Sequence, residues 1–288
     1  MPLSQNGKQV GTAPTVEQAK RWIFSDRPVN LETNRLWEGG NLVREQIDDI
    51  AERIVAPIRG DISIGGGTDS ITFAVHGSWG AGKTSFINMV LEQAKILVKL
   101  EDKQDLFMSC WYHAAAFEGT SLNARATLAM QVLLTLAGGD KEEAIKIFSK
   151  RVDQAEIANL NLNEVSEIEA ITIKNQYLEE ISARLSGMVS FDEILKAELT
   201  GEGDISPGES KVLVIVIDDI DRCSRDYIGS ILETIQQWSN VGNLFFILAV
   251  DRDVLNEAIT HRYGSKGLNI ERLGPAVALE KYVQHSVE

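Results

Sequence analysis

The glycine-rich stretch FAVHGSWGAGKTSF at 73–86 constrains the fold of this chain more than any other. Four of its residues match the pattern G-x-x-x-x-G-K-[ST] of a phosphate-binding loop: Gly77, Gly82, Lys83 and Thr84. Apolar and β-branched residues at 71–75 precede the loop, as in a buried strand, and apolar residues recur at helical spacing after it. A strand, a glycine-rich loop and a helix in this order predict an α/β fold with a site for a phosphorylated ligand.

Each residue type in the loop has a physical role in holding phosphate. Glycine lets the backbone bring several N–H groups around one anion, and the following helix directs its positive end at that anion. Lys83 would supply charge for the outer phosphates, and the Thr84 hydroxyl would ligate Mg²⁺. The residues expected to contact the ligand are Gly77, Ser78, Trp79, Gly80, Ala81, Gly82, Lys83, Thr84 and Ser85. Two alternatives stay open: a surface turn that binds nothing, and a Trp79 that only packs beneath the loop.

A pair of carboxylates forms the second half of the expected site. The run KVLVIVI at 211–217 is apolar after its lysine, which fits a strand buried on both faces of a sheet, and Asp218 and Asp219 end it. Asp218 would hold Mg²⁺ through a water molecule, and Asp219 would orient or deprotonate an attacking water. The alternative is that both aspartates are N-caps opening a turn at 220–224.

An acid directly after the metal ligand favours hydrolysis over transfer to an acceptor. A small-molecule kinase usually carries an arginine-rich lid, and the sequence shows no such cluster. Guanine-specific proteins commonly carry an Asn-Lys-x-Asp run, which this sequence lacks, so ATP is the expected nucleotide. Two other functions remain open: a P-loop kinase, and a nucleotide-bound scaffold that holds ATP without turning it over.

Charge and composition exclude some classes of partner. The 288 residues carry a formal net charge of −14 and a sequence pI near 4.8. Such a surface would neither coat nucleic acid nor dock on anionic lipid, although a local basic groove stays open. The longest apolar runs are too short to span a bilayer, and the first thirty residues contain no signal peptide. Cys110 and Cys223 indicate core filling in a reducing, cytoplasmic setting.

Periodicity predicts the remaining elements. Besides the strands at 71–76 and 211–217, apolar runs predict strands at 105–111 and 244–250. His113 follows the run at 105–111, and we read it as a hydrogen-bonded strand end or as a polar residue of the site. The helices expected from apolar spacing, besides the one after the loop, lie at 18–24, 41–57, 122–136, 140–151, 163–185, 191–199, 227–238, 254–258 and 277–283.

The hexapeptide DDIDRC at 218–223 resembles the DDLDRC-like stretch that follows the Walker B strand in the KAP family of P-loop NTPases. Four other segments resemble family motifs: Ser25–Val29, Met108–Tyr112, Ala249–Arg252 and Leu279–Gln284. The likeness thus runs from about residue 25 to residue 284. It implies Mg²⁺-dependent ATP hydrolysis in a sheet of the additional-strand type, related to AAA+ and STAND proteins, in which hydrolysis switches an assembly.

The resemblance also implies partners and further site residues. Bacterial members are often tied to phage exclusion or defence, so the expected partners are other copies of the chain or a defence protein. By position, Arg252 would be a sensor-like residue near the γ-phosphate, and Asp221 and Arg222 would form the signature turn. Lys281 is a further candidate. Many members insert transmembrane helices between the Walker motifs, but the apolar stretch here at 126–137 is too short, so no membrane role is expected.

Together these observations predict a three-layer α/β P-loop NTPase with a mostly parallel central sheet. The expected domains are an N-terminal segment at 1–24, a core at 25–118 and 206–288, and an α-helical insertion at 119–205 between Walker A and Walker B. The chain ends just after the late family motif, where relatives usually continue, which indicates a truncated chain or a minimal member.

Overall fold

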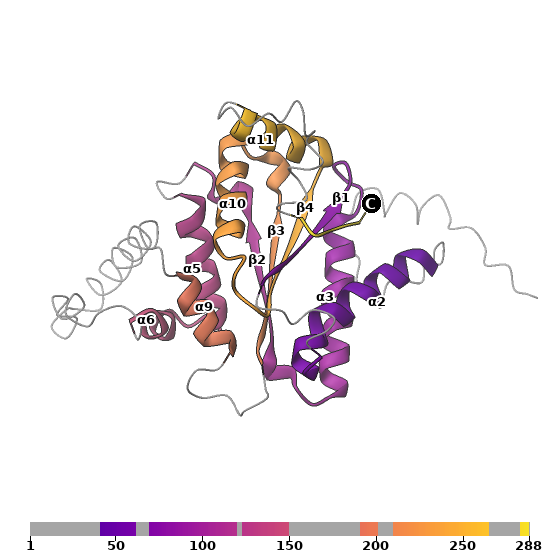
Figure 1. The fold of residues 1–288 in the computed structure, drawn as a ribbon, viewed down its shortest axis with the longest axis vertical. Helices are drawn as coiled ribbons and strands as arrows, with labels where there is room; N and C mark the ends of the chain where they lie inside the picture. The colour runs from indigo at the N-terminus through magenta and orange to yellow at the C-terminus, as the bar shows by residue number, and fades with distance from the viewer. Residues whose placement is uncertain are drawn as a thin grey trace, which may run out of the picture.

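Two apolar runs form the centre of the sheet in the computed structural model, which describes residues 41–61, 69–119, 123–149, 191–200, 210–264 and 283–287. VLVIVID forms β3 and LFFILAV forms β4, and every residue of both strands is buried. The described strands are β1 (Ile71–His76), β2 (Phe107–His113), β3 (Val212–Asp218), β4 (Leu244–Val250) and β5 (His285–Val287). They make one five-stranded sheet in the order β2-β3-β4-β1-β5 (Figure 1).

All strand pairs in this sheet are parallel, and β4 lies between the strand before the glycine loop and the strand that ends in the aspartates. Val75 of β1 pairs with Ala249 of β4, and Ile217 of β3 pairs with Leu248. The extra strand between the two halves of the site is the additional strand that the sequence resemblance implied. Because the strands are parallel, their carboxyl ends meet at one edge, where ligands of open α/β sheets bind.

Helices cover both faces of the sheet, so the expected three-layer α/β fold is confirmed (Figure 1). Alternate strand residues divide between two hydrophobic clusters, one on each face. One cluster packs under α2 (Asn41–Val55) and α3 (Lys83–Leu100). The other packs under α5 (Ala124–Leu136), α6 (Lys141–Ser149), α9 (Phe191–Thr200), α10 (Arg225–Gln237) and α11 (Arg252–Gly264). The described helices of the expected insertion thus contribute to the same core as α10; the domain boundaries themselves stay a prediction.

Several element ends differ from the sequence expectation for local reasons. β2 begins two residues late because Gln104–Leu106 form the 3-10 helix η3. α2 ends at Val55, and the 3-10 helix η2 (Ala56–Arg59) follows with Pro57 in its first turn. α10 begins two residues early because the side chain of Ser224 accepts from the Tyr227 amide and caps the helix.

The short strand β5 was not expected from the sequence. The helix expected at 277–283 lies outside the described residues except for Val283, which is not helical. The expectations at 18–24, 25–29 and 163–185, and the candidate Lys281, also lie outside the described residues. Within the part of the chain that the structure describes, no helix combines the length and apolar character needed to cross a bilayer.

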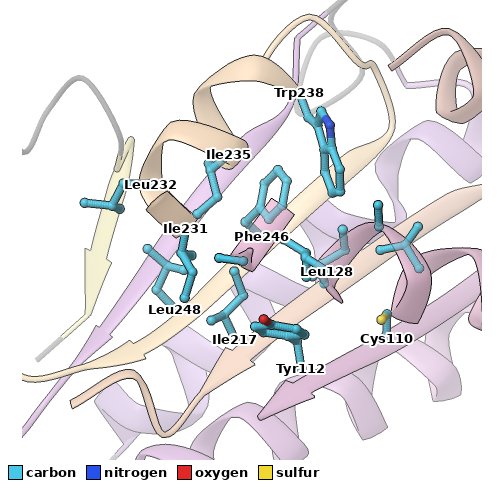
Figure 2. Close-up of a cluster of buried hydrophobic side chains, with 14 of the residues drawn as sticks. Cys110, Tyr112, Leu128, Ile217, Ile231, Leu232, Ile235, Trp238, Phe246 and Leu248 are labelled. Atoms are coloured by element: carbon cyan, nitrogen blue, oxygen red, sulfur yellow. The ribbon is translucent and has the colours of Figure 1, made fainter. Parts of the chain in front are cut away.

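A buried hydroxyl network joins three elements on the α10 side of the sheet. The Tyr112 hydroxyl of β2 lies 2.7 Å from Thr127 Oγ1 of α5 and 2.7 Å from the Tyr227 hydroxyl of α10. Figure 2 shows Tyr112 among the apolar side chains of this cluster, near Ile217 and Leu128. Burial raises the pKa of Tyr112, so the side chain stays a neutral donor and acceptor.

We expect Tyr112→Phe to lower the free energy of unfolding by about 1–3 kcal/mol, because it leaves two hydroxyls in the core without this partner. Urea denaturation followed by circular dichroism measures the change. Tyr227→Phe is the matched control: Tyr227 is only half-buried and its removal leaves the Tyr112–Thr127 contact, so the loss should be smaller. Equal losses for the two variants would contradict the network.

Candidate nucleotide-binding site

The glycine loop adopts a backbone shape that depends on glycine at defined positions. Gly80 and Gly82 have φ of 80° and 92°, in the left-handed region that side chains disfavour. At Gly77 an added Cβ would lie 2.9 Å from the Cβ of Ala81, so the loop closes on itself too tightly for a side chain. The turn is held by a 3.1 Å bond from the Ala81 amide to the Ser78 carbonyl. This compact turn leads directly into α3, whose N-terminus favours an anion.

Lys83 is the first residue of α3, and its ammonium folds back over the loop. Its Nζ donates to the Gly77 carbonyl at 2.8 Å and lies 3.4 Å from the Ser78 carbonyl. It also donates to Asp221 Oδ2 at 2.8 Å. Only 10% of the Lys83 side chain is exposed, so water screens this charge less than it would a surface lysine. The Lys83 ammonium thus lies beside the loop carbonyls, and its role in holding the outer phosphates stays a prediction.

The two halves of the expected site meet directly. Thr84 Oγ1 donates to Asp218 Oδ2 at 2.9 Å, although the two residues are 134 positions apart in the chain. Asp218 is the last residue of β3 and is buried, and its other oxygen accepts from the Asp219 amide at 2.8 Å. The structure therefore brings together Lys83, Thr84 and Asp218, as the motif pair required.

The Asp219 carboxylate contacts a different set of residues from that of Asp218. It has a positive φ of 58°, which turns the chain at the end of β3. Its carboxylate lies 3.3 Å from Arg222 Nε and 3.9 Å from His113 Nδ1. Although Asp219 occupies the N-cap position of the 3-10 helix η5 (Ile220–Arg222), its side chain makes no capping bond. The N-cap interpretation therefore does not describe this carboxylate, which lies partly exposed on the rim of the site; its role as a base stays a prediction.

Asp221 has a position that sequence reasoning assigned only to a signature turn. Oδ2 of Asp221 accepts from Lys83, while Oδ1 accepts from the backbone amide of Asp251 at 2.6 Å. The sequence has a third acid two residues after the aspartate pair, and the loop has one lysine whose charge an acid could neutralise. Together these two features could have indicated this role. The spacing alone did not say which of the three carboxylates would face that lysine.

The other expected residues lie around this centre. Ser78, Trp79, Gly80 and Ala81 form the exposed crest of the loop, and Ser85 lies in the first turn of α3. The side chain of Trp79 is 80% exposed, so the alternative that it packs beneath the loop is wrong. Arg252 is exposed and begins α11, one residue beyond Asp251 at the carboxyl edge of the sheet. Its sensor role stays a prediction.

The donor set fits a phosphate ligand with Mg²⁺. Thr84 and Asp218 present a hydroxyl and a carboxylate side by side, and Mg²⁺ in such sites takes one or two protein oxygens together with substrate phosphates. Among the described residues there is no group of three or more His, Cys, Asp or Glu that could hold a metal. Burial, more than the nearby Glu118, raises the pKa of the Cys223 thiol to about 12, which makes it a neutral core residue.

Comparison with known proteins identifies the family. The model of the KAP family P-loop domain matches residues 44–284. No curated protein matches the chain. Among solved structures, the chain is similar to the ORC2 protein of Aeropyrum pernix in ADPNP and ADP complexes, at 12% identity and a TM-score of 0.39. That likeness covers 87% of this chain and 48% of the ORC2 chain, and at this level it says nothing of function.

The family match extends over far more than half of the chain and includes both the glycine loop and the aspartate-ended strand. The chain therefore belongs to the KAP family of P-loop NTPases.

Proposed function

We propose that the chain binds ATP with Mg²⁺ and hydrolyses it, as the switch or motor subunit of an assembly. The observation that carries this proposal is the 2.9 Å contact between Thr84 Oγ1 and Asp218 Oδ2. It puts the hydroxyl of the glycine loop beside the buried carboxylate of β3, which is the pair of oxygens a phosphate-bound Mg²⁺ needs. Bound there, Mg²⁺ would neutralise charge on the outer phosphates.

Lys83 and Asp219, which lie near this pair, would have different roles in hydrolysis. Lys83 would hold the outer phosphates and offset the charge that develops as the terminal phosphoryl group leaves. Asp219 would take a proton from the attacking water, whose oxygen forms the new bond to phosphorus while the bond to ADP breaks. The partial exposure of its carboxylate, 36% of the side chain, supports access to water.

We also propose that this activity serves bacterial antiphage defence, with other copies of the chain or a defence protein as partner. Membership of the KAP family supports this part of the proposal. We expect the mass of the chain in solution to rise when ATP and Mg²⁺ are added, as it would for an assembly switched by nucleotide. Light scattering coupled to gel filtration measures it; a mass that does not respond would contradict a self-assembling switch.

We expect Lys83→Ala to weaken binding of the ATP analogue ADPNP by about 100-fold, because a charge-assisted contact to phosphate is worth roughly 1.5–3 kcal/mol. Titration calorimetry in the presence of Mg²⁺ measures the affinity. Lys99→Ala is the matched control, since it removes the same charge from the exposed far end of the same helix. If wild type and Lys83→Ala bind ADPNP equally, the phosphate site is elsewhere.

We expect Asp219→Asn to bind ADPNP normally but to turn ATP over about 100-fold to 10,000-fold more slowly, as general bases contribute that much. Phosphate release without any added acceptor measures turnover, with an EDTA sample as the blank. Undiminished turnover in the variant would remove Asp219 from the role of base. A wild-type chain that binds ATP and releases no phosphate would instead be a scaffold, and release only with an added acceptor would indicate a kinase.

A further inference from the structure

Asp221 connects the loop lysine to the start of α11. One carboxylate oxygen accepts from Lys83 Nζ at 2.8 Å, and the other accepts from the Asp251 amide at 2.6 Å. The Asp221 side chain is 18% exposed and that of Lys83 10%, so the ion pair is shielded from water on most sides. Asp221 thus links the glycine loop to Asp251, which belongs to neither the loop nor the aspartate-ended strand. This link goes beyond the turn that the sequence assigned to Asp221.

The hydrogen-bonding capacity of Lys83 limits what it can hold at once. An ammonium donates three hydrogens, and Lys83 Nζ already meets three acceptors: the carbonyls of Gly77 and Ser78 and Oδ2 of Asp221. A phosphate oxygen would be a fourth. The two carbonyls belong to a loop whose backbone is held by its own turn bond, whereas a carboxylate can rotate away. Asp221 is therefore the contact that a phosphate would replace.

Asp251 directly precedes α11 and supports its first turn. Its carboxylate accepts from the Asp253 amide at 2.9 Å, and its carbonyl accepts from the Leu255 amide at 3.0 Å. The first bond satisfies an amide of the first helical turn that has no intrahelical partner, and the second is the first backbone bond of the helix. α11 in turn is joined to α10 by a two-bond contact between Arg262 and Glu233, at 3.0 and 2.7 Å. A change at Asp221 thus acts on the anchor of a helix that is firmly packed on its neighbour.

We propose that Asp221 is a positioning residue that competes with the nucleotide for Lys83 and ties that exchange to the first turn of α11. The proposal rests on the nucleotide binding put forward above. When the outer phosphates take the ammonium, Asp221 releases it and its hold on the Asp251 amide changes. The start of α11, where Arg252 lies at the surface, then changes when a nucleotide occupies the loop.

Asp221→Asn tests the exchange, because the amide keeps an oxygen for Asp251 but loses the charge that holds Lys83. We expect ADPNP with Mg²⁺ to bind this variant at least about 5-fold more tightly than wild type, because exposed ion pairs contribute up to about that factor and this pair is mostly shielded from water. Asp226→Asn is the control, since Asp226 carries the same charge on the nearby first turn of α10 with 74% of its side chain exposed. Unchanged or weaker binding by a folded Asp221→Asn would overturn the proposal, whereas a purely structural role would not tighten binding.

Hydrogen exchange at 251–255 tests the link to α11. In wild type we expect ADPNP to change the exchange rate of these amides, and in Asp221→Asn we expect that response to disappear. A wild-type segment that ignores bound ADPNP would overturn the link. If wild type binds no ADPNP at all, the proposed function fails and this proposal with it; if wild type binds and Asp221→Asn behaves as wild type, only the proposal for Asp221 fails.

Discussion

The hydrogen bond between Thr84 and Asp218 depends on almost everything else in the described structure. It requires β1 and β3 to run parallel, so that the loop after one strand and the aspartate at the end of the other reach the same edge. In this sheet β4 lies between them and pairs in parallel with both, which fixes their relative direction. The helices on both faces bury the sheet, including β3 and β4, whose residues are all buried.

The acidic residues at this edge would repel one another and an anionic ligand if they all faced the same way. The structure separates them, because the positive φ of Asp219 turns the chain sharply at the end of β3. Asp218 faces Thr84, Asp219 faces Arg222 and His113, and Asp221 faces Lys83. The three carboxylates of this short segment thus have different partners, and two of these partners, Lys83 and Arg222, carry positive charge. This separation is what the proposed roles of Asp218 toward Mg²⁺ and of Asp219 toward water would require, while Asp221 holds the lysine.

Much of the fold could be predicted from residue patterns, and the misses have identifiable causes. The apolar run at 244–250 predicted both ends of its strand correctly, because a strand buried on both faces has no polar interruptions, and the run at 211–217 was one residue early at each end. The start of β2 was wrong by two residues because a 3-10 turn precedes it, and such turns leave little trace in periodicity. β5 was missed because three residues pair with β1 through backbone atoms, and their side chains show no pattern long enough to recognise.

By itself the sequence determined that this chain has a phosphate loop, a second acidic segment and enough apolar length for a sheet covered on both faces. Those features are local, since glycine, lysine and aspartate at fixed spacing carry their chemistry with them. Only the tertiary structure decided which acid meets which partner: Asp221, not Asp219, holds Lys83, and Trp79 lies in the open rather than under the loop. The reason is that side-chain direction at the end of a strand depends on one backbone turn, and residue spacing does not specify it.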